Sequence, residues 1–377
     1  MNLARLLLTC AALSLALSLG GCESVLTQVL RDSQQSGKPL LIEFSATWCG
    51  PCKFMEQQVF PDERVKEGMS HFQVARLDVD EARGKELFQA LRGSAMPTFV
   101  VLDEAGAEHA RHRGRMSAEQ LCAFLTDARK YALSDAAFRE RERTAPTDPV
   151  TLLIQARRAR ARGDEGEAQQ AYARALHFDA DDQSGVGALA QWEAQHLRLD
   201  ARTCQAGDSG CAQALVPEKT SEAMAFVQRF PRSPKALGEL RDALLGGALS
   251  QERREALSEH LLGAQPALSS DDQTELVYVL LAANLHVQAQ RVAQALLTAA
   301  PSDPGAFALL AEVYHENGAQ AQALSLTQQA LSLAQSDARR RSLQQDLERF
   351  QQGRGAANPR LRGAVEEARR SLLSGRP

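Results

Sequence analysis

The feature of this sequence that most constrains its fold is a cysteine pair placed between an apolar stretch and a helical stretch. Residues 40–44 form a short apolar run of strand length, the motif Trp48-Cys49-Gly50-Pro51-Cys52-Lys53 follows closely, and residues 54–66 have the pattern of a helix. Pro51 suits the first turn of that helix, so Cys49 is expected just before its N-terminus. There the helix dipole and the free backbone N–H groups favour a thiolate. The motif therefore predicts a reactive dithiol on an α/β scaffold.

Strands and helices continue to alternate after this motif. A turn at residues 104–107 joins two of the expected strands, and Ser117 is placed to cap a closing helix. The pattern predicts a domain over residues 22–133. Its further strands are expected at residues 72–79, 97–102 and 108–113, and its further helices at residues 82–91 and 117–131.

A Cys-x-x-Cys motif also occurs in metal sites, which are the main alternative to redox chemistry. A zinc site would need a second pair of ligands nearby, but the next cysteine after Cys52 is Cys122, at the far end of the expected domain. His109 and His112 are three positions apart on an expected strand, so they would lie on opposite faces. The spacing favours a dithiol, and we expect neither a metal nor a cofactor.

The cysteine motif at a strand-to-helix junction, with Met96-Pro97-Thr98 at the start of a later strand, resembles the thioredoxin family. The resemblance extends over the domain expected at residues 22–133. It implies a thioredoxin fold, in which a mixed central sheet is flanked by helices, and thiol–disulfide oxidoreductase activity. Three further segments are similar to the thioredoxin-like domains of periplasmic thiol:disulfide interchange proteins: Lys38-Pro39-Leu40, Glu56, and Val59-Phe60-Pro61-Asp62 followed by Val65.

The resemblance gives the two cysteines different roles. Cys49, exposed before the helix, is expected to be the attacking nucleophile, and Cys52, one turn on and less exposed, to resolve the mixed disulfide. The alternative for the whole domain is a recognition module without turnover. Substrate contact is expected for Gly50 and Pro51, and Trp48 is expected to shield the disulfide and to pack against the substrate.

Two other positions complete the expected active site. By the family resemblance Pro97 is cis and exposes the backbone of Met96 to a substrate strand; the alternative is an ordinary proline at a strand start. Glu43 lies in an apolar strand, six residues before Cys49, where thioredoxins commonly carry a buried Asp. A buried carboxyl there should have a raised pKa and relay the proton of Cys52. The alternative is a surface Glu on an edge strand.

For two further residues in this domain, a structural role is favoured over a catalytic one. Glu56 is a candidate second acid, but an exposed helical Glu is the favoured reading. Cys122 stands between Leu121 and Phe124, so a packed thiol is favoured over a redox group.

The N-terminus resembles an export signal that ends in a lipid-attachment site. Arg5 precedes an apolar run over residues 6–19, which has the length of a signal-peptide core and is too short to span a bilayer comfortably. The run ends in Leu19-Gly20-Gly21-Cys22, which resembles the lipobox of bacterial lipoproteins. Residues 1–21 are therefore expected to be removed and Cys22 to be acylated. The alternatives are an ordinary secreted protein and a single anchor helix.

This signal predicts a lipid-anchored protein of the bacterial cell envelope that faces the periplasm. Glu23, rather than Asp, after the cysteine permits outer-membrane delivery in enterobacteria-like sorting. Disulfides persist in this compartment. We expect Cys204 and Cys211, with Gly, Asp and Ser between them, to form a structural disulfide across a flexible turn rather than a helix. The alternative is a second redox pair that exchanges with the first.

A charged linker over residues 134–148 precedes an expected helical-repeat domain over residues 149–352, and residues 353–377 are expected to form a capping helix and tail. Val277, Leu280, Ala289 and Ala293 recur at one constant spacing as Ala311, Tyr314, Ala323 and Thr327, and Ala156, Ala168, Tyr172 and Ala175 fit the same frame. This spacing resembles that of tetratricopeptide (TPR) repeats, with an interruption around residues 186–270. Such arrays usually bind a peptide or protein, which the sequence does not identify.

Composition limits the other partners. The formal net charge is −4, which is no basic footprint for nucleic acid. The chain has no nucleotide fingerprint, so its electrons are expected to come from a separate membrane reductant. The sequence thus predicts an envelope thiol–disulfide oxidoreductase that acts on protein thiols and disulfides. Gly-Pro between the cysteines favours a reductase, and the alternative is a TPR-type binding scaffold.

Overall fold

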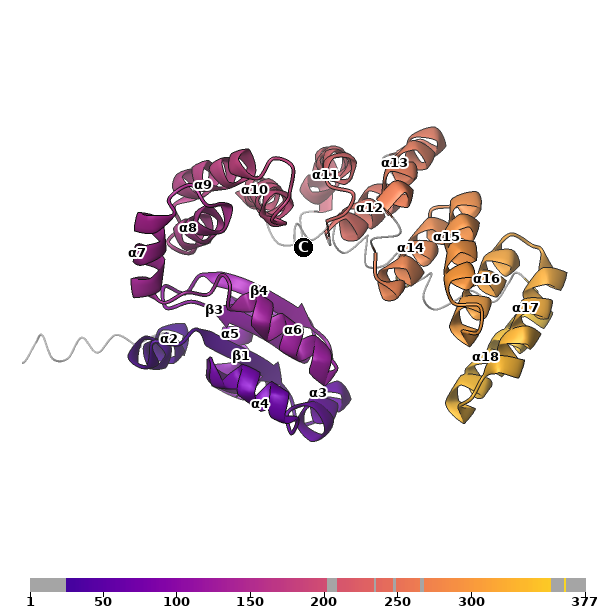
Figure 1. Cartoon of the computed structure of the whole chain (residues 1–377), viewed down its shortest axis with the longest axis horizontal. Helices are drawn as coiled ribbons and strands as arrows, with labels where there is room; N and C mark the ends of the chain where they lie inside the picture. Colours follow the sequence, from indigo (N-terminus) through magenta and orange to yellow (C-terminus); the bar gives the residue numbers. More distant parts are fainter. Residues whose placement is uncertain are drawn as a thin grey trace, which may run out of the picture. The chain divides into compact units, whose positions relative to one another are not determined.

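The computed structural model describes residues 25–201, 209–233, 235–246, 249–264, 268–353 and 363 (Figure 1). The chain divides into two compact units, the first ending at Phe178 and the second beginning at Asp179. The sequence pattern placed a boundary at residue 149, so the structure adds two helices to the first unit. These helices, α8 (Pro149–Ala161) and α9 (Glu165–Phe178), belong to the first unit because buried hydrogen bonds join α8 to the sheet.

The first unit contains a four-stranded mixed sheet with the strand order β2-β1-β3-β4. β1 pairs in parallel with β2 and antiparallel with β3, which pairs antiparallel with β4. β1, β2 and β4 therefore end, and β3 begins, along one side of the sheet that runs across the strands. This side is here called the sheet edge. The predicted mixed sheet is confirmed. The strands are β1 (Leu40–Ser45), β2 (Gln73–Asp78), β3 (Thr98–Leu102) and β4 (Glu108–Arg113).

Helices cover both faces of this sheet, which explains why the central strand β1 is apolar over most of its length. On one face Val29 and Leu87 pack against Ile42. On the other face Met55 and Leu125 belong to the same core cluster as Leu41, the neighbour of Ile42 in β1. The first face carries α2 (Val25–Ser36) and α5 (Ala82–Ala90), and the second carries α3 (Gly50–Phe54), the π-helical turn η1 (Met55–Val59), α4 (Glu63–Ser70) and α6 (Ala118–Ala128).

The single helix expected over residues 54–66 is broken in the structure. η1 ends at Val59, and Pro61 has no backbone N–H with which to continue a helical ladder. α4 then starts afresh, because the Asp62 carboxylate accepts a hydrogen bond from the backbone N–H of Arg64 at 2.9 Å. The expectation of one continuous helix was wrong, since the proline and the capping acid were not weighed.

Three helices complete the first unit: α7 (Asp135–Thr144), α8 (Pro149–Ala161) and α9 (Glu165–Phe178). Pro149 occupies the first turn of α8, and Asp148 caps it by accepting a hydrogen bond from the backbone N–H of Thr151. Most of α8 is buried, including the two charged side chains of Arg157 and Arg158. Buried charges require partners, and these come from the β3–β4 hairpin.

The partners of α8 are the buried side chains of Asp103 and His109. Oδ2 of Asp103 accepts a hydrogen bond from Nε of Arg158 at 2.7 Å and lies 3.0 Å from Nε2 of His109. A guanidinium nitrogen of Arg157 donates to the backbone carbonyl of His109 at 3.1 Å. Burial alone would raise the pKa of Asp103, but the hydrogen bond from His109 and the charge of Arg158 outweigh it, so the net pKa is lowered. The hairpin and α8 therefore share one satisfied buried network.

The second unit is helical throughout its described residues. Pro217 lies inside α11. The helices are α10 (Val186–Ala201), α11 (Ser209–Arg229), α12 (Ala236–Leu245), α13 (Gln251–Ala264), α14 (Ser270–Ala282), α15 (His286–Ala299), α16 (Pro304–Glu316), α17 (Gln320–Leu333) and α18 (Asp337–Gln351). They follow one another as packed neighbours, with α14 against α15, α16 against α17 and α17 against α18 (Figure 1).

The repeat spacing found in the sequence coincides with helix pairs of equal length. The step from the start of α14 to the start of α16 equals the step from α15 to α17, and both equal the spacing of the recurring residues. Each pair turns at a residue with positive φ, Asn284 (60°) in one and Gly318 (76°) in the other. In the first unit α8 and α9 turn in the same way at Gly163 (78°). The recurring small residues Ala289, Ala293 and Ala323 are buried, which lets the paired helices approach closely.

Several sequence predictions fall on residues outside the described ranges: the lipidation of Cys22, the position of Cys204, and most of residues 353–377. One part of the expected turn is described. α11 begins at Ser209, so the backbone of Cys211 is helical rather than part of a flexible turn. No helix in the described ranges has both the length and the apolar character needed to cross a bilayer.

Candidate active site

The two motif cysteines are joined in a disulfide at the sheet edge where β1 leads into α3. Their Cα atoms are 5.3 Å apart. Cys49 is the N-cap of α3, and its Sγ accepts a hydrogen bond from the backbone N–H of Cys52 at 3.2 Å. Pro51 lies in the first turn, as predicted. A thiolate on Cys49 would therefore face the N-terminal N–H groups of the helix.

The expected exposure of Cys49 is wrong for this oxidised form. Cys49 is only 4% exposed, close to the 1% of Cys52. The reason is that the disulfide holds Cys49 in a small cluster with Ala46, against which Met96 packs. The exposed surface of the motif belongs instead to Gly50 and Pro51 and to the neighbouring Trp48.

The segment before β3 lies beside the disulfide at the same sheet edge. The Met96–Pro97 peptide bond is cis, as the family resemblance implied. The carbonyl of Pro97 accepts a hydrogen bond from the backbone N–H of Gly114 at 2.8 Å, which ties this segment to the loop after β4. Within the described part of the chain no hydrogen bond engages the backbone of Met96. Its N–H and C=O groups are thus available to pair with an incoming strand.

The indole of Trp48 is fixed by a residue that sequence analysis did not identify. Its Nε1 donates a hydrogen bond to Oδ2 of Asp80 at 2.8 Å, and the side chain is 64% exposed. Trp48 therefore presents its ring to solvent. Asp80 comes two residues after the end of β2. A polar residue directly after a strand that is parallel to β1 is expected near the cysteine motif, and this position could have identified Asp80 from the sequence.

Glu43 is a buried acid, which excludes the alternative of a surface residue. It lies in β1, is 1% exposed and, among the described residues, has no hydrogen bond to its carboxyl oxygens. Because side chains alternate along a strand, Glu43 faces the same side as Leu41, where η1 and its Met55 pack. Burial raises the pKa of Glu43 to about 7; the charge of Arg76 lowers it in part, and the nearby exposed Glu56 adds a smaller rise.

Arg76 is the second residue that sequence analysis missed. The parallel register of β1 and β2 places it directly beside Glu43, with Nε 3.2 Å from Oε2 but outside hydrogen-bond geometry. Its guanidinium carbon lies 4.6 Å from the centre of the Phe60 ring, and about half of the side chain is exposed. Arg76 thus connects the buried acid to solvent. A charged residue inside β2 was visible in the sequence, but the register that pairs it with Glu43 was not.

Comparison with known proteins identifies this domain. A family profile described as a thioredoxin-like domain matches residues 26–129. The thioredoxin of Acidithiobacillus ferridurans is 37% identical over 94 residues, which are 25% of this chain and 82% of that protein. The chain belongs to the thioredoxin-like family.

Longer relatives match the same thioredoxin-like domain. The thiol:disulfide interchange protein DsbD of Campylobacter jejuni is 27% identical over 95 residues, and that of Escherichia coli K12 is 32% identical over 98 residues. Each match is 25% of this chain and 17% of the relative's length. The residues that match the family profile, 26–129, contain Cys49 and Cys52, so the thioredoxin-like domain carries the dithiol of a thiol–disulfide oxidoreductase.

The other candidate ligands and thiols of the thioredoxin-like domain lie apart from this pair. His109 belongs to the Asp103 network, whereas the ring of His112 lies 6.3 Å from that of Phe124 on the other face. The described residues contain no group of three or more His, Cys, Asp or Glu side chains arranged for a metal. Cys122 is a free thiol, half-buried against the core, which agrees with a packed residue.

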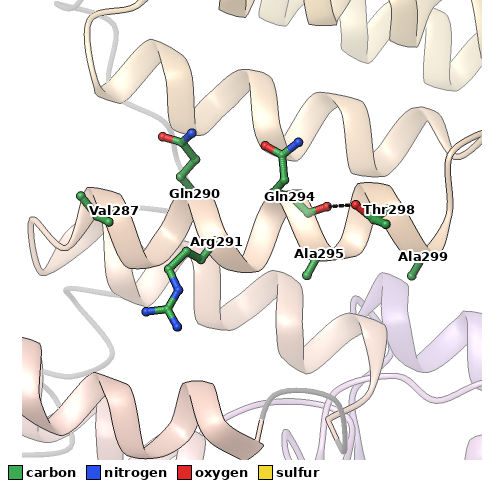
Figure 2. A pocket seen from close by; sticks show the side chains of 7 residues that line it. All are labelled: Val287, Gln290, Arg291, Gln294, Ala295, Thr298 and Ala299. Atoms are coloured by element: carbon green, nitrogen blue, oxygen red, sulfur yellow. Dashed lines mark hydrogen bonds between the residues drawn. The ribbon is translucent and has the colours of Figure 1, made fainter.

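A hollow of about 770 Å³ in the second unit is lined by side chains of α15 (Figure 2). It holds neither a cysteine nor a carboxylate, and its Arg291 is paired with Glu259 of α13 at 2.8 Å. Its chemistry therefore differs from that of the disulfide site. The residues that line it are Val287, Gln290, Arg291, Gln294, Ala295, Thr298 and Ala299.

Proposed function

We propose that this protein is a thiol–disulfide reductase of the bacterial cell envelope, anchored through lipid on Cys22, with a helical region that binds proteins. One observation carries the redox part. The Cys49–Cys52 disulfide and the unpaired backbone of Met96 lie together at one sheet edge, and β1, which leads to that edge, carries the buried acid Glu43 two residues before its end. These are a nucleophile, a substrate-binding strand and a proton acceptor.

The reaction begins from the reduced dithiol. The thiolate of Cys49 attacks one sulfur of a client disulfide, which releases one client thiolate and leaves a mixed disulfide on Cys49. Cys52 then loses its proton and attacks the Sγ of Cys49. The second client sulfur departs as a thiolate, and the Cys49–Cys52 disulfide forms. Two electrons have passed to the client, whose thiolates take up protons from the site and solvent.

Glu43 suits the second step because of its raised pKa. A carboxyl with a pKa of about 7 is partly ionised near neutral pH, so it can accept the proton of Cys52 and return it in the next cycle. Arg76 lies between this carboxyl and solvent and favours its ionised form. The relay is therefore open to proton exchange from the β2 side.

The regeneration of the dithiol requires an electron donor outside this chain. Two of the relatives are named thiol:disulfide interchange protein DsbD, and the match covers only 17% of the length of each. We propose that a separate membrane reductant supplies the electrons. The Gly-Pro pair between the cysteines supports the reductive direction.

The anchor and the helical region support a fixed position in the envelope. Only Glu23 and Ser24 separate Cys22 from α2, whose Val25 and Val29 are packed in the core. A lipid on Cys22 would therefore hold the thioredoxin-like domain close to the membrane surface. The regularly spaced helix pairs support TPR-like repeats, and such stacks present extended surfaces for protein ligands.

Reduction of insulin disulfides by the full-length chain, with dithiothreitol as the electron source, tests this function. We expect turnover that needs both cysteines, so that Cys49→Ser and Cys52→Ser each abolish it. Equilibration with glutathione buffers should give a potential nearer to about −270 mV than to about −120 mV, which is the range of reductants rather than oxidants. A reducible disulfide without turnover would instead identify a binding scaffold.

A further inference from the structure

An aromatic and basic surface adjoins the disulfide and has no part in the proposed chemistry. Phe54 is 37% exposed and presents part of its ring at the surface. The guanidinium carbon of Arg115 lies 5.1 Å from the centre of its ring. Such stacking holds an arginine in one orientation and leaves the N–H groups at its rim free. Phe54 and Arg115 thus form a preorganised cationic site.

Two independent connections place this pair beside the reacting bond. Phe54 follows Gly50 and Pro51 by four and three residues in one short helix, so the three share a face. Arg115 follows Gly114, whose backbone N–H is bonded to the carbonyl of Pro97. The pair is therefore linked on one side to the exposed turn of the motif and on the other to the segment whose backbone is free to pair with a client.

The charge of Arg115 is not neutralised by a neighbouring acid. Its side chain is exposed, and among the described residues no carboxylate forms an ion pair with it. Lys53, next to Phe54, is also exposed and has no ion-pair partner among the residues that the structure describes. Among the described residues, two cations without an ion-pair partner are thus present, Arg115 on the ring of Phe54 and Lys53 next to Phe54 in the sequence.

The opposite end of the same sheet edge carries the opposite charge. β2 and β4 are the outermost strands, and the loop after β2 presents the exposed acids Asp80 and Glu81. The loop after β4 presents Arg115 instead. A client chain that crosses the disulfide therefore meets Arg115 on one side and Asp80 and Glu81 on the other.

We propose that Arg115, supported by the ring of Phe54, selects client disulfides that carry an Asp or Glu side chain close to the reacting cysteine. A planar guanidinium matches the two oxygens of a carboxylate, so a stacked arginine recognises this group better than a mobile lysine does. Arg115 contacts the client rather than the reacting sulfurs, so it determines specificity. This inference rests on the proposed reductase function, because it needs a client disulfide at the site.

The test uses the reduced full-length chain and three disulfide-linked peptide dimers. In each peptide, the residues two positions before and two positions after the cysteine are the same. They are Glu in the first dimer, Gln in the second and Lys in the third, and the dimers are otherwise identical. The second-order rate constant of peptide reduction is measured for the natural protein, Arg115→Glu, Arg115→Lys and Arg129→Glu. Arg129 is an exposed arginine at the far end of α6, so Arg129→Glu makes the same charge change away from the site.

We expect the natural protein and Arg129→Glu to reduce the Glu peptide on the order of fivefold faster than the Lys peptide, as for an exposed ion pair. Arg115→Glu should reverse this order, and Arg115→Lys should keep it with a smaller difference. The preference should shrink as salt is raised. Equal rates for the three peptides, or an unchanged order in Arg115→Glu, would overturn the proposal. If none of the peptides, including the neutral one, is reduced, the reductase function itself fails.

Discussion

Nε of Arg158 donates a hydrogen bond of 2.7 Å to Oδ2 of Asp103, and both side chains are buried although they lie far apart in the sequence. The same guanidinium donates to the backbone carbonyl of Leu133 at 2.8 Å and lies 3.0 Å from Oδ1 of Asp135. One arginine of α8 thus contacts the β3–β4 hairpin, the segment after α6 and the first residue of α7.

Replacement of this arginine should strongly destabilise the thioredoxin-like domain. Arg158→Met leaves the carboxylate of Asp103 buried without its cation, and breaking one side of such a pair costs about 3–5 kcal/mol. Thermal and urea unfolding would measure the loss. Arg162→Met is the matched control, because Arg162 pairs with Glu167 at the surface, where an ion pair contributes about 0–1 kcal/mol. Equal effects of the two changes would contradict this role of the network.

The carboxyl of Glu43 should make the folded protein less stable as the pH rises. Its pKa is raised from 4.5 to about 7 in the folded state, so between these values the folded protein binds more protons than the unfolded chain. Stability must then fall as pH increases through this window, by a total of about 3 kcal/mol. Glu43→Gln should therefore stabilise the oxidised protein at pH 8 and change it much less at pH 4. Urea unfolding at both pH values checks this, with the exposed Glu67→Gln as control.

The charge of Arg76 should set the pH at which Cys52 becomes reactive. Arg76 favours the ionised form of Glu43, so Arg76→Gln should raise the pKa of that carboxyl further. The pH midpoint for release of a client from a mixed disulfide on Cys49 should move upward by about half a unit, since the arginine is partly exposed and screened. Stopped-flow measurement of this step across pH gives the midpoint. Arg76→Lys should retain the natural value, and a midpoint unaffected by Arg76→Gln would contradict the assignment.

The division of roles between the cysteines should be visible by trapping. Cys52→Ala removes the resolving thiol, so mixed disulfides between Cys49 and clients or the electron donor should accumulate. Mass spectrometry of the trapped species would also identify these partners. Cys49→Ala is the reciprocal variant and should trap far fewer. Accumulation through Cys52 alone would show that the two roles are reversed.

The lipid anchor should depend on one side chain. In a bacterial host supplied with labelled palmitate, the full-length chain should incorporate label, and Cys22→Ser should not. Cys122→Ser is the matched control, because it removes a thiol that is half-buried in the described structure. Continued labelling of Cys22→Ser would rule out lipidation at this site.

The parts of this site that sequence analysis predicted are those determined by neighbours along the chain. The Cys-Gly-Pro-Cys turn follows from a strand that leads directly into a helix, and the burial of Glu43 follows from its place within an apolar strand. The regular spacing of α14 and α16 was visible for the same reason. Local patterns of this kind need no knowledge of the tertiary structure.

The parts that were missed depend on contacts between distant segments. Asp80 meets Trp48 across a sheet edge, and Arg76 meets Glu43 through a strand register that periodicity does not reveal. The cover over Cys49 depends on Met96, which is separated from the motif in the sequence by η1, α4, β2 and α5. The boundary near residue 149 was inferred from a proline-rich break, but tertiary contacts of α8 cross that break.

The hydrogen bond between Asp103 and Arg158 also has a consequence for the evolution of this chain by domain exchange. Because Arg158 of α8 neutralises the buried carboxylate of Asp103, an exchange of the thioredoxin-like domain at the loop before α8 would disturb this pair. Recombination in that loop would separate Asp103 from Arg158, which is its only arginine ion-pair partner among the described residues. We therefore expect the redox domain and the α8–α9 pair to be inherited together, and homologues without α8 to carry an apolar residue in place of Asp103.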